Sequence, residues 1–230
     1  MPTLANGLAI MAKAPVAGLV KTRLVPPLTL EQAAQLYRAL LADQLEHLKG
    51  YAGAARYVAY TPNDAAAQIG ALGGDAYTYI AQKGDDLGRR MEQLFVDCWQ
   101  LGHRNVVLVG SDLPALPLAI LDDAFTQLSC AEPKVVLGPS RDGGYYLIGM
   151  NRPTPELFAG MTWSHDQVLT ETTARLRRLA ISFSSLPEWF DIDTPEDVQR
   201  LRGSNDLALR CRMAKTFACL ATLDDSPSKF

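Results

Sequence analysis

Apolar positions follow two different rhythms along the chain, and the two rhythms alternate. Short runs of consecutive apolar residues suit strands that are buried on both faces. Between them lie longer stretches in which apolar residues recur every three or four positions, as they do in amphipathic helices. The regular alternation of the two predicts an α/β fold with a mostly parallel sheet and right-handed crossovers.

The predicted elements cover most of the chain. The strands are expected at residues 8–12, 57–60, 77–80, 106–109, 135–137, 145–148 and 181–183. The helices are expected at residues 30–48, 62–72, 87–101, 116–128, 165–179 and 207–223, the first of them capped by Thr29. We expect one domain over residues 1–202 and a C-terminal helix and tail over residues 203–230. This helix packs on the domain or on a partner subunit of a homodimer, and residues 224–230 are frayed.

Composition and charge exclude several classes of function. The 230 residues are 48% hydrophobic, which suits a full core, and the formal net charge is −3. A chain without a basic excess has little with which to displace counterions, which argues against general nucleic-acid binding. No apolar run reaches the roughly 18 residues of a membrane span, and no secretion signal is recognisable. With four cysteines that form no CxxC pair, these features predict a cytoplasmic protein that binds neither membranes nor nucleic acid.

A basic loop follows the first predicted strand. Lys13, Lys21 and Arg23 surround a bend that contains Pro15 and Gly18. Backbone N–H groups after a strand, a following helix start and basic side chains together favour phosphate. The loop matches neither the Walker A pattern nor a dinucleotide fingerprint, and the alternative is a solvated surface loop with scattered lysines. We favour a site for a polyphosphate.

A carboxylate stands just after the most apolar predicted strand. Asp112 lies in the stretch Val-Gly-Ser-Asp-Leu-Pro, and Pro114 keeps the residue before it extended. Magnesium commonly takes one or two carboxylates together with substrate phosphates, which suits Asp112. The same position suits an N-cap for the following helix, and the sequence does not separate the two interpretations.

Paired glycines mark a turn before another predicted strand, in Ser-Arg-Asp-Gly-Gly-Tyr-Tyr at residues 140–146. Gly143 and Gly144 allow a tight turn and a close approach of a ligand to the backbone. Arg141 and Asp142 then face the hydroxyls of a sugar or of an acceptor. The alternative is a hairpin turn of the Asp-Gly type, and the two interpretations are compatible.

Two more carboxylates come shortly before a helix start. Asp191 and Asp193 are two residues apart, so in an extended chain both face the same side. Thr194 and Pro195 form a helix start, and Asp197 completes a capping box, which gives these three residues structural roles. Asp191 and Asp193 are therefore the metal candidates, with a solvated acidic turn as the alternative.

Two other helix starts contain polar residues for which capping is the favoured interpretation. Asp85 and Asp86 suit the N-terminus of the helix at residues 87–101. Ser164 is expected to cap the helix at residues 165–179, with His165 on the surface but within reach of a substrate.

Taken in order, these segments resemble a known family. The motifs are KxPxxGxVKTRL, GDDLGRRM, VGSDLP, SRDGGYYLIG, TWS and DIDTPEDV, and they extend from about residue 8 to residue 201. They resemble the radical-SAM/selenodomain-associated transferases, which are linked to arsenosugar glycosyltransferases and belong to the GT-A-like nucleotide-diphospho-sugar transferases. More distantly, the chain is similar to the molybdenum-cofactor and phospholactate guanylyltransferases.

The resemblance implies a three-layer α/β/α sandwich with a nucleotide on the carboxyl edge of a mostly parallel, mixed sheet. It implies that the nucleotide is bound by Lys13, Gly18, Lys21, Thr22 and Arg23. It implies that Mg²⁺ or Mn²⁺ is held by Asp112, Asp193 and Asp191, and that Asp112 and Asp142 are catalytic. The first acid of the Asp-x-Asp motif of many glycosyltransferases is missing from Gly-Ser-Asp. The substrate is expected to contact Arg141, Gly143, Gly144 and His165.

Two reactions fit such a site. In glycosyl transfer a nucleoside diphosphate leaves the anomeric carbon, whereas in nucleotidyl transfer an acceptor attacks the α-phosphorus of a triphosphate and releases pyrophosphate. Both need a divalent cation. The family favours glycosyl transfer to a small acceptor, while three cations in one loop and a lone aspartate favour nucleotidyl transfer to a small phosphorylated acceptor. The third interpretation, a nucleotide-binding protein without activity, is disfavoured because the aspartates are retained.

Overall fold

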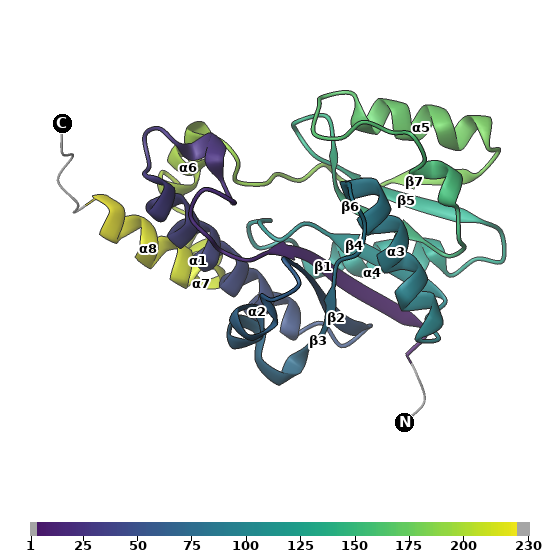
Figure 1. Ribbon diagram of the computed structural model, residues 1–230, viewed down its shortest axis with the longest axis horizontal. Coiled ribbons are helices and arrows are strands. Elements are labelled where there is room, and N and C mark those ends of the chain that lie inside the picture. Colours follow the sequence, from purple (N-terminus) through teal and green to yellow (C-terminus); the bar gives the residue numbers. More distant parts are fainter. Residues whose placement is uncertain (1–3, 225–230) are drawn as a thin grey trace.

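The short apolar runs form the seven strands of one sheet in the computed structural model, which describes residues 4–224 (Figure 1). The strands are β1 (Asn6–Lys13), β2 (Ala55–Thr61), β3 (Thr78–Ala81), β4 (Asn105–Val109), β5 (Lys134–Pro139), β6 (Tyr145–Met150) and β7 (Ser182–Ser185). They lie in the order β3-β2-β1-β4-β6-β5-β7. β6 runs antiparallel to both of its neighbours, and the other pairs are parallel, so the predicted mostly parallel sheet is confirmed.

Helices cover both faces of this sheet. Within residues 4–224 they are α1 (Leu30–Lys49), α2 (Ala66–Gly73), α3 (Leu87–Gln100), α4 (Leu118–Leu128), α5 (Val168–Arg178), α6 (Pro195–Arg202), α7 (Leu207–Arg212) and α8 (Ala214–Asp224). Short 3₁₀ helices lie at Thr22–Leu24, Gly74–Ala76 and Pro155–Leu157. One apolar core joins α1, α2 and α4 to the sheet, and a second joins α3 and α5 to its other face. The predicted three-layer α/β/α sandwich is therefore confirmed.

The first strand shows how the two cores share the sheet. Leu8 and Ile10 are fully buried on the side of α1, whereas Ala9 and Met11 face the side of α3. Because both faces are covered, the strand is apolar from Leu8 to Ala12 instead of alternating with polar residues.

Three predicted helices differ from the observed ones. The helix expected at residues 62–72 begins at Ala66, and the one expected at residues 165–179 begins at Val168. Ser164 is not its N-cap: Ser164 has a φ of 67°, and the N-cap is Gln167, whose side chain makes no capping hydrogen bond. The helix expected at residues 207–223 is interrupted at Met213 and forms α7 and α8. Of the tail expected to fray, residues 225–230 lie outside the described residues.

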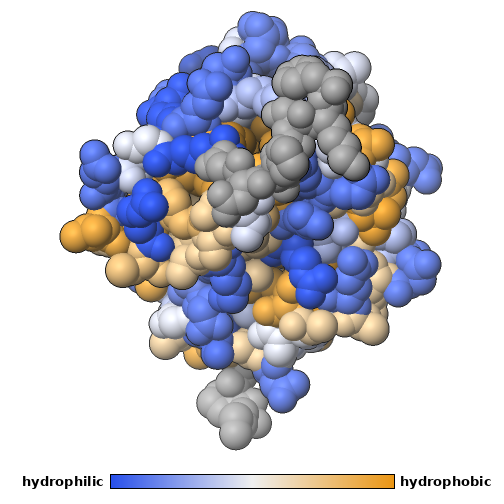
Figure 2. Space-filling view, turned by 90° about the vertical axis from the view of Figure 1, so that its left-hand side faces the viewer, coloured by the Kyte–Doolittle hydropathy of each residue, from blue (hydrophilic) through white to orange (hydrophobic). Residues whose placement is uncertain are grey.

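The C-terminal helices pack on the face of α1 that is turned away from the sheet. Met213 and Leu220 are each 2% exposed in a third apolar core, which also contains Leu36 and Leu40 of α1. Figure 2 views the molecule from this side and shows hydrophilic and apolar residues interspersed on the surface. Residues 207–224 therefore pack on the domain itself, which is the first of the two predicted arrangements. Within residues 4–224, every helix is too short or too polar to cross a lipid bilayer.

The strand directions bring four segments to one edge of the sheet. Ile10 of β1 pairs with Val109 of β4 in parallel, so the segments that follow both strands leave at the same edge. Val109 pairs with Leu147 of the antiparallel β6, so the turn between β5 and β6 also lies there. An isolated bridge between Ser140 and Trp189 adds the chain that follows β7. The predicted basic loop, the Asp112 segment, the Asp-Gly-Gly turn and the second acidic segment therefore meet.

Candidate active site

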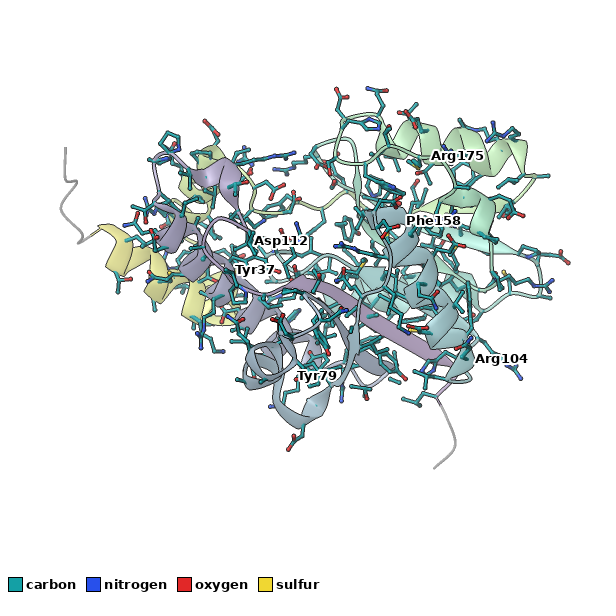
Figure 3. The ribbon with its side chains drawn as sticks, viewed as in Figure 1. Tyr37, Tyr79, Arg104, Asp112, Phe158 and Arg175 are labelled. Carbon is teal, nitrogen blue, oxygen red and sulfur yellow. The ribbon has the colours of Figure 1, made fainter. Side chains whose placement is uncertain are left out.

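A cavity of about 420 Å³ lies at this edge of the sheet. Its lining comes from all four convergent segments, from α1, from the start of α3 and from the loop before α5. Ligands of open α/β sheets bind outside the carboxyl ends of the strands, and this cavity has that position. Figure 3 shows Asp112 and Tyr37 near this edge, whereas Arg104, which precedes β4, lies at the other end of the sheet.

Three carboxylates gather on the wall of the cavity. One oxygen each from Asp112, Asp191 and Asp193 lies within 4.8 Å of the other two. The alternative role of Asp112 as a helix cap is wrong, because α4 begins at Leu118, six residues later, with Pro117 as its N-cap. The backbone at Asp112 is therefore not part of a helix start, and its side chain is turned to the other acids.

Lys21 is the counter-charge of this cluster. Its Nζ donates to Asp112 and, at 2.7 Å, to Asp193, and its side chain is only 4% exposed. Burial alone would lower the pKa of Lys21, but the two carboxylates outweigh burial and raise it. The backbone of Lys21 is left-handed, with a φ of 50°. This conformation is energetically unfavourable for residues other than glycine. The guanidinium of Arg23 lies 3.4 Å from Asp193 at a more exposed position.

Among the described residues, Asp191 is the acid of this cluster that forms no ion pair. The pKa of Asp191 is raised to about 7, mainly by burial and also by the nearby carboxylates of Asp112, Asp193 and Asp142, against a lowering by Lys21. One ammonium group thus faces three carboxylates that all carry hard oxygen donors. This donor set and its excess of negative charge fit a magnesium or manganese ion.

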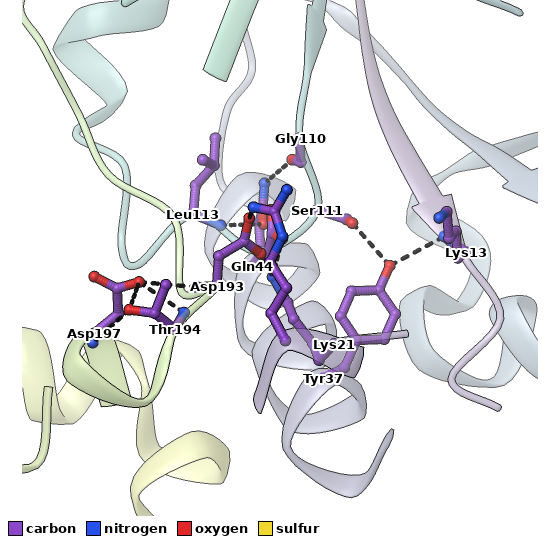
Figure 4. A network of polar contacts seen from close by, with 12 residues as sticks. Lys13, Lys21, Tyr37, Gln44, Gly110, Ser111, Leu113, Asp193, Thr194 and Asp197 are labelled. Carbon is purple, nitrogen blue, oxygen red and sulfur yellow. Dashed lines mark hydrogen bonds and ion pairs between the residues drawn. The ribbon is translucent and has the colours of Figure 1, made fainter. Parts of the chain in front are cut away.

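Two side chains of α1 hold the loop that carries Asp112 (Figure 4). Gln44 donates to the carbonyl of Gly110 at 2.7 Å and accepts from the backbone N–H of Leu113 at 3.1 Å. The Tyr37 hydroxyl lies 2.8 Å from Ser111 Oγ and accepts from the backbone N–H of Lys13. Sequence reasoning missed both α1 residues. The signal was present, since Gln44 lies on the apolar stripe of α1 between Leu41 and Leu48.

The Asp-Gly-Gly turn is a hairpin turn that also borders the cavity. Asp142 Oδ1 accepts from the Ser140 hydroxyl and, at 3.0 Å, from the backbone N–H of Gly144. Gly143 has a φ of 86°, and a Cβ there would lie 2.0 Å from the carbonyl oxygen of Asp166. The close approach that Gly143 permits is therefore to the loop before α5. The hairpin interpretation is confirmed, and the contact of this turn with a substrate stays a prediction, for which Ser140, Asp142 and Gly144 line the cavity.

The remaining predicted residues divide between the cavity and its surroundings. Lys13, Lys21, Thr22 and His165 line the cavity, whereas Gly18, Arg23, Arg141 and Gly143 lie outside its lining. The Arg141 side chain is directed to Glu188, at 3.3 Å, and over the ring of Phe190.

His165 is held by its own loop. Its Nε2 lies 3.0 Å from Thr162 Oγ1 and 3.2 Å from the Thr162 carbonyl, and its Nδ1 accepts from the backbone N–H of Gln167. The ring is therefore fixed at the rim of the cavity.

An apolar wall faces the carboxylates across the cavity. Its members, which were not predicted as site residues, are Leu87, Met91, Tyr145, Trp163 and Val168. A Cβ on Gly88 would lie 2.6 Å from the Trp163 ring, so the indole packs directly on the first turn of α3. Asp86 caps this helix as predicted, by accepting from the backbone N–H of Arg89 at 2.8 Å.

The sequence and the fold were compared with those of proteins of known structure. A protein from Desulfovibrio desulfuricans G20, provisionally described as a nucleotide-diphospho-sugar transferase, is 32% identical over 96% of both chains, with a TM-score of 0.86. A cytidylyltransferase from Leptospira borgpetersenii serovar Hardjo-bovis is 15% identical, covers 96% of both chains and has a TM-score of 0.57. A 4-diphosphocytidyl-2C-methyl-D-erythritol synthase is 12% identical over 87% of this chain and 98% of its own, with a TM-score of 0.52. At these lower identities the likeness is one of fold.

The chain is thus a transferase with the nucleotide-diphospho-sugar transferase fold. It belongs to the family described as "Uncharacterized protein conserved in bacteria (DUF2064)", whose profile matches residues 44–165. No protein of curated function matches the chain. The narrower resemblance to radical-SAM-associated and arsenosugar transferases stays a prediction.

Proposed function

We propose that the protein transfers a glycosyl group from a nucleotide-sugar to a small acceptor, with Mg²⁺ or Mn²⁺ at Asp112, Asp191 and Asp193. The observation that carries the proposal is the meeting of three carboxylates and a buried lysine on the wall of one cavity. The relative that is 32% identical over nearly the full chain supports the same class of donor. We also propose that the protein is cytoplasmic, as the sequence predicts.

The end of β1 and the loop after it would bind the diphosphate of the donor. Lys13, Lys21 and Thr22 line the cavity and offer two ammonium groups and a hydroxyl. As the glycosidic bond breaks, the leaving nucleoside diphosphate gains negative charge, and these groups stabilise that charge. A divalent cation bound to the three aspartates would neutralise the same charge.

The other half of the cavity would take the acceptor. The Asp142 carboxylate is oriented by Ser140 and by the Gly144 N–H, which keeps it at the cavity wall. We assign to Asp142 the contact with the attacking hydroxyl, with His165 at the rim as the other candidate base. Trp163 and Met91 offer apolar surface on which the body of an acceptor can pack.

Nucleotidyl transfer is the second candidate. It is favoured by two lysines that line the cavity beside the single aspartate of the segment after β4. In this reaction an acceptor phosphate attacks the α-phosphorus of a triphosphate, and pyrophosphate leaves. The same residues would then stabilise the charge of pyrophosphate.

A thermal-shift screen separates the candidates. Nucleotide-sugars and nucleoside triphosphates are each added with and without Mg²⁺, since a ligand that binds the folded state stabilises it, and more so the tighter it binds at a given concentration. Magnesium-dependent stabilisation by a nucleotide-sugar supports glycosyl transfer, and by a triphosphate supports nucleotidyl transfer with release of pyrophosphate.

Two aspartate variants, one in the site and one outside it, serve as the test and the control of this screen. Asp112→Asn should abolish the magnesium dependence, whereas Asp75→Asn, at an exposed position outside the cavity lining, should preserve it. Full turnover by Asp112→Asn would contradict the metal assignment, and silence across the panel would favour a protein without this activity.

A further inference from the structure

The side chain of Lys21 lies where a divalent cation would be coordinated. A magnesium ion bound to Asp112 and Asp193 would lie roughly 2.0–2.1 Å from one oxygen of each. Lys21 Nζ already donates to one oxygen of Asp112 and one of Asp193, so it lies between the same two carboxylates. Two cations held by the same oxygens would be separated by only a few ångströms and would repel each other. The lysine and the metal therefore cannot share this position.

Burial makes the displacement of Lys21 unfavourable. The side chain of Lys21 is 4% exposed, whereas that of Arg23, the other cation on Asp193, is 58% exposed. A buried charge that loses its partners is strongly destabilising, because neither water nor another ion replaces them. Lys21 consequently needs a new anion before it leaves, and the phosphates of a nucleotide in the adjoining cavity are such an anion.

We propose that Lys21 is an internal competitor of the metal, which keeps the Asp112–Asp193 pair occupied until the phosphates of the substrate draw the lysine away. The inference rests on the proposed metal site and adds a role for Lys21 within it. It makes metal binding weak in the absence of nucleotide and couples the two binding events. Because Lys21 competes for the same carboxylates, its removal should strengthen the binding of the metal alone.

The test measures Mn²⁺ binding to the full chain without nucleotide, by calorimetric titration. Lys21→Met should bind Mn²⁺ about tenfold or more tightly than the wild type, within the usual range of coupling. The matched control is Lys13→Met, which removes the same charge from the same cavity. The ion pairs that Asp112 and Asp193 form with the described residues involve Lys21 and Arg23, so Lys13→Met should change the affinity far less.

The outcomes separate this inference from the proposed function. Equal or weaker Mn²⁺ binding by Lys21→Met, with clear binding by the wild type, overturns the competition but leaves the metal site in place. Absence of Mn²⁺ binding by both proteins at millimolar concentrations overturns the metal site and the competition together. Tighter binding by Lys21→Met and by Lys13→Met alike would reveal a general charge effect and overturn the specific role of Lys21.

The melting temperature provides a second test, which remains informative if Lys21→Met folds poorly. Lys21→Met leaves three neighbouring carboxylates without their buried counter-charge, so its melting temperature should fall in metal-free buffer. If Mn²⁺ takes the place of the ammonium group, it should raise the melting temperature of Lys21→Met more than that of the wild type, or restore its circular dichroism. A failure of Mn²⁺ to do either would overturn the proposal.

Discussion

Asp43 and Gln44 are neighbours in the chain, yet they serve opposite sides of α1. The Asp43 carboxylate accepts from the backbone N–H and the hydroxyl of Thr216, at 2.7 and 2.8 Å, and so holds the first turn of α8. Gln44 reaches the other way and bonds both ends of the loop that carries Asp112. Consecutive residues of a helix are about 100° apart, which allows one helix to support the C-terminal segment and the site together.

Loss of the Asp43 contacts should detach the C-terminal helices. Asp43 is 4% exposed and also accepts from the backbone N–H of Lys215, so it satisfies N–H groups that α8 itself cannot. We expect Asp43→Ala to lower the free energy of unfolding by about 1.5–3 kcal/mol, the usual range for hydrogen bonds to a charged group. Urea denaturation measures the change, and Asp75→Ala is the exposed control. A loss no larger than that of the control would contradict the clamp.

Loss of the Gln44 contacts should act on the site through Asp112. Gln44→Leu leaves the Gly110 carbonyl and the Leu113 N–H without their partner, and the loop between them loses its fixed position. Residues that orient metal ligands typically contribute about tenfold or more to metal affinity. We therefore expect Gln44→Leu to weaken Mn²⁺ binding by about this factor.

A conservative variant distinguishes positioning from general damage. Gln44→Glu keeps an acceptor for Leu113 but loses the donor to Gly110, so it should recover part of the Mn²⁺ affinity. If Gln44→Leu and Gln44→Glu lost stability equally and neither changed the Mn²⁺ affinity, the role of Gln44 would be limited to folding.

The acidic cluster should respond to pH through Asp191. The pKa of Asp191 is raised to about 7, so in the folded protein this carboxyl keeps its proton at pH values where an unfolded chain has lost it. Because the folded state binds the extra proton, the contribution of Asp191 to stability is complete at low pH and is lost as the pH rises from about 4 towards 7. A metal has to displace the same proton, so Mn²⁺ affinity should rise between pH 6 and pH 8.

Asp191→Asn isolates this effect. In metal-free buffer at pH 8 the substitution removes a repelled charge and should stabilise the protein by about 1–2 kcal/mol, after allowance for solvent screening. At pH 5 the wild-type carboxyl is already protonated, and the substitution should change little. Thermal melting at the two pH values provides the comparison, and an equal effect at both would refute the assignment of the shift to Asp191.

The sheet was predictable because its signal is local. The apolar run of β4 from Val106 to Val109 is fully buried, as expected for a strand that is covered on both faces. The capping box of Thr194 and Asp197 formed as predicted for a similar reason, since the residues involved are three apart. Because neighbouring strands such as β1 and β4 are parallel, the loops that follow them lie at one edge of the sheet, although they are far apart in the sequence.

The contacts within the site were not predictable, because they depend on where loops end in space. Lys21 was assigned to phosphate and Asp193 to a metal, and 172 positions separate the two residues that form an ion pair. Serine is a common N-cap residue, but the left-handed backbone of Ser164 precludes that role. The space that Gly143 leaves is filled by the carbonyl of Asp166, which no pattern near residue 143 reveals.

Gly88 and Trp163 connect two motifs that lie far apart in the chain, and their contact can be tested against a matched glycine. Gly70 also lies inside a helix, but a Cβ there would meet nothing within 4 Å. Gly70→Ala should therefore stabilise the protein by up to about 1 kcal/mol, the difference in helix propensity. Gly88→Ala should instead destabilise it by about 1–3 kcal/mol, because the new methyl group overlaps the Trp163 ring.

A smaller side chain at position 163 provides the decisive control. If the overlap is the cause, Gly88→Ala combined with Trp163→Leu should cost less than the sum of the two single substitutions, a coupling that urea denaturation detects. Displacement of Trp163 from the cavity wall should also raise the KM of the acceptor more than that of the donor. Additive losses would show that α3 tolerates the added methyl group without moving the indole, and the apolar wall of the cavity would then have to be held in place by other contacts.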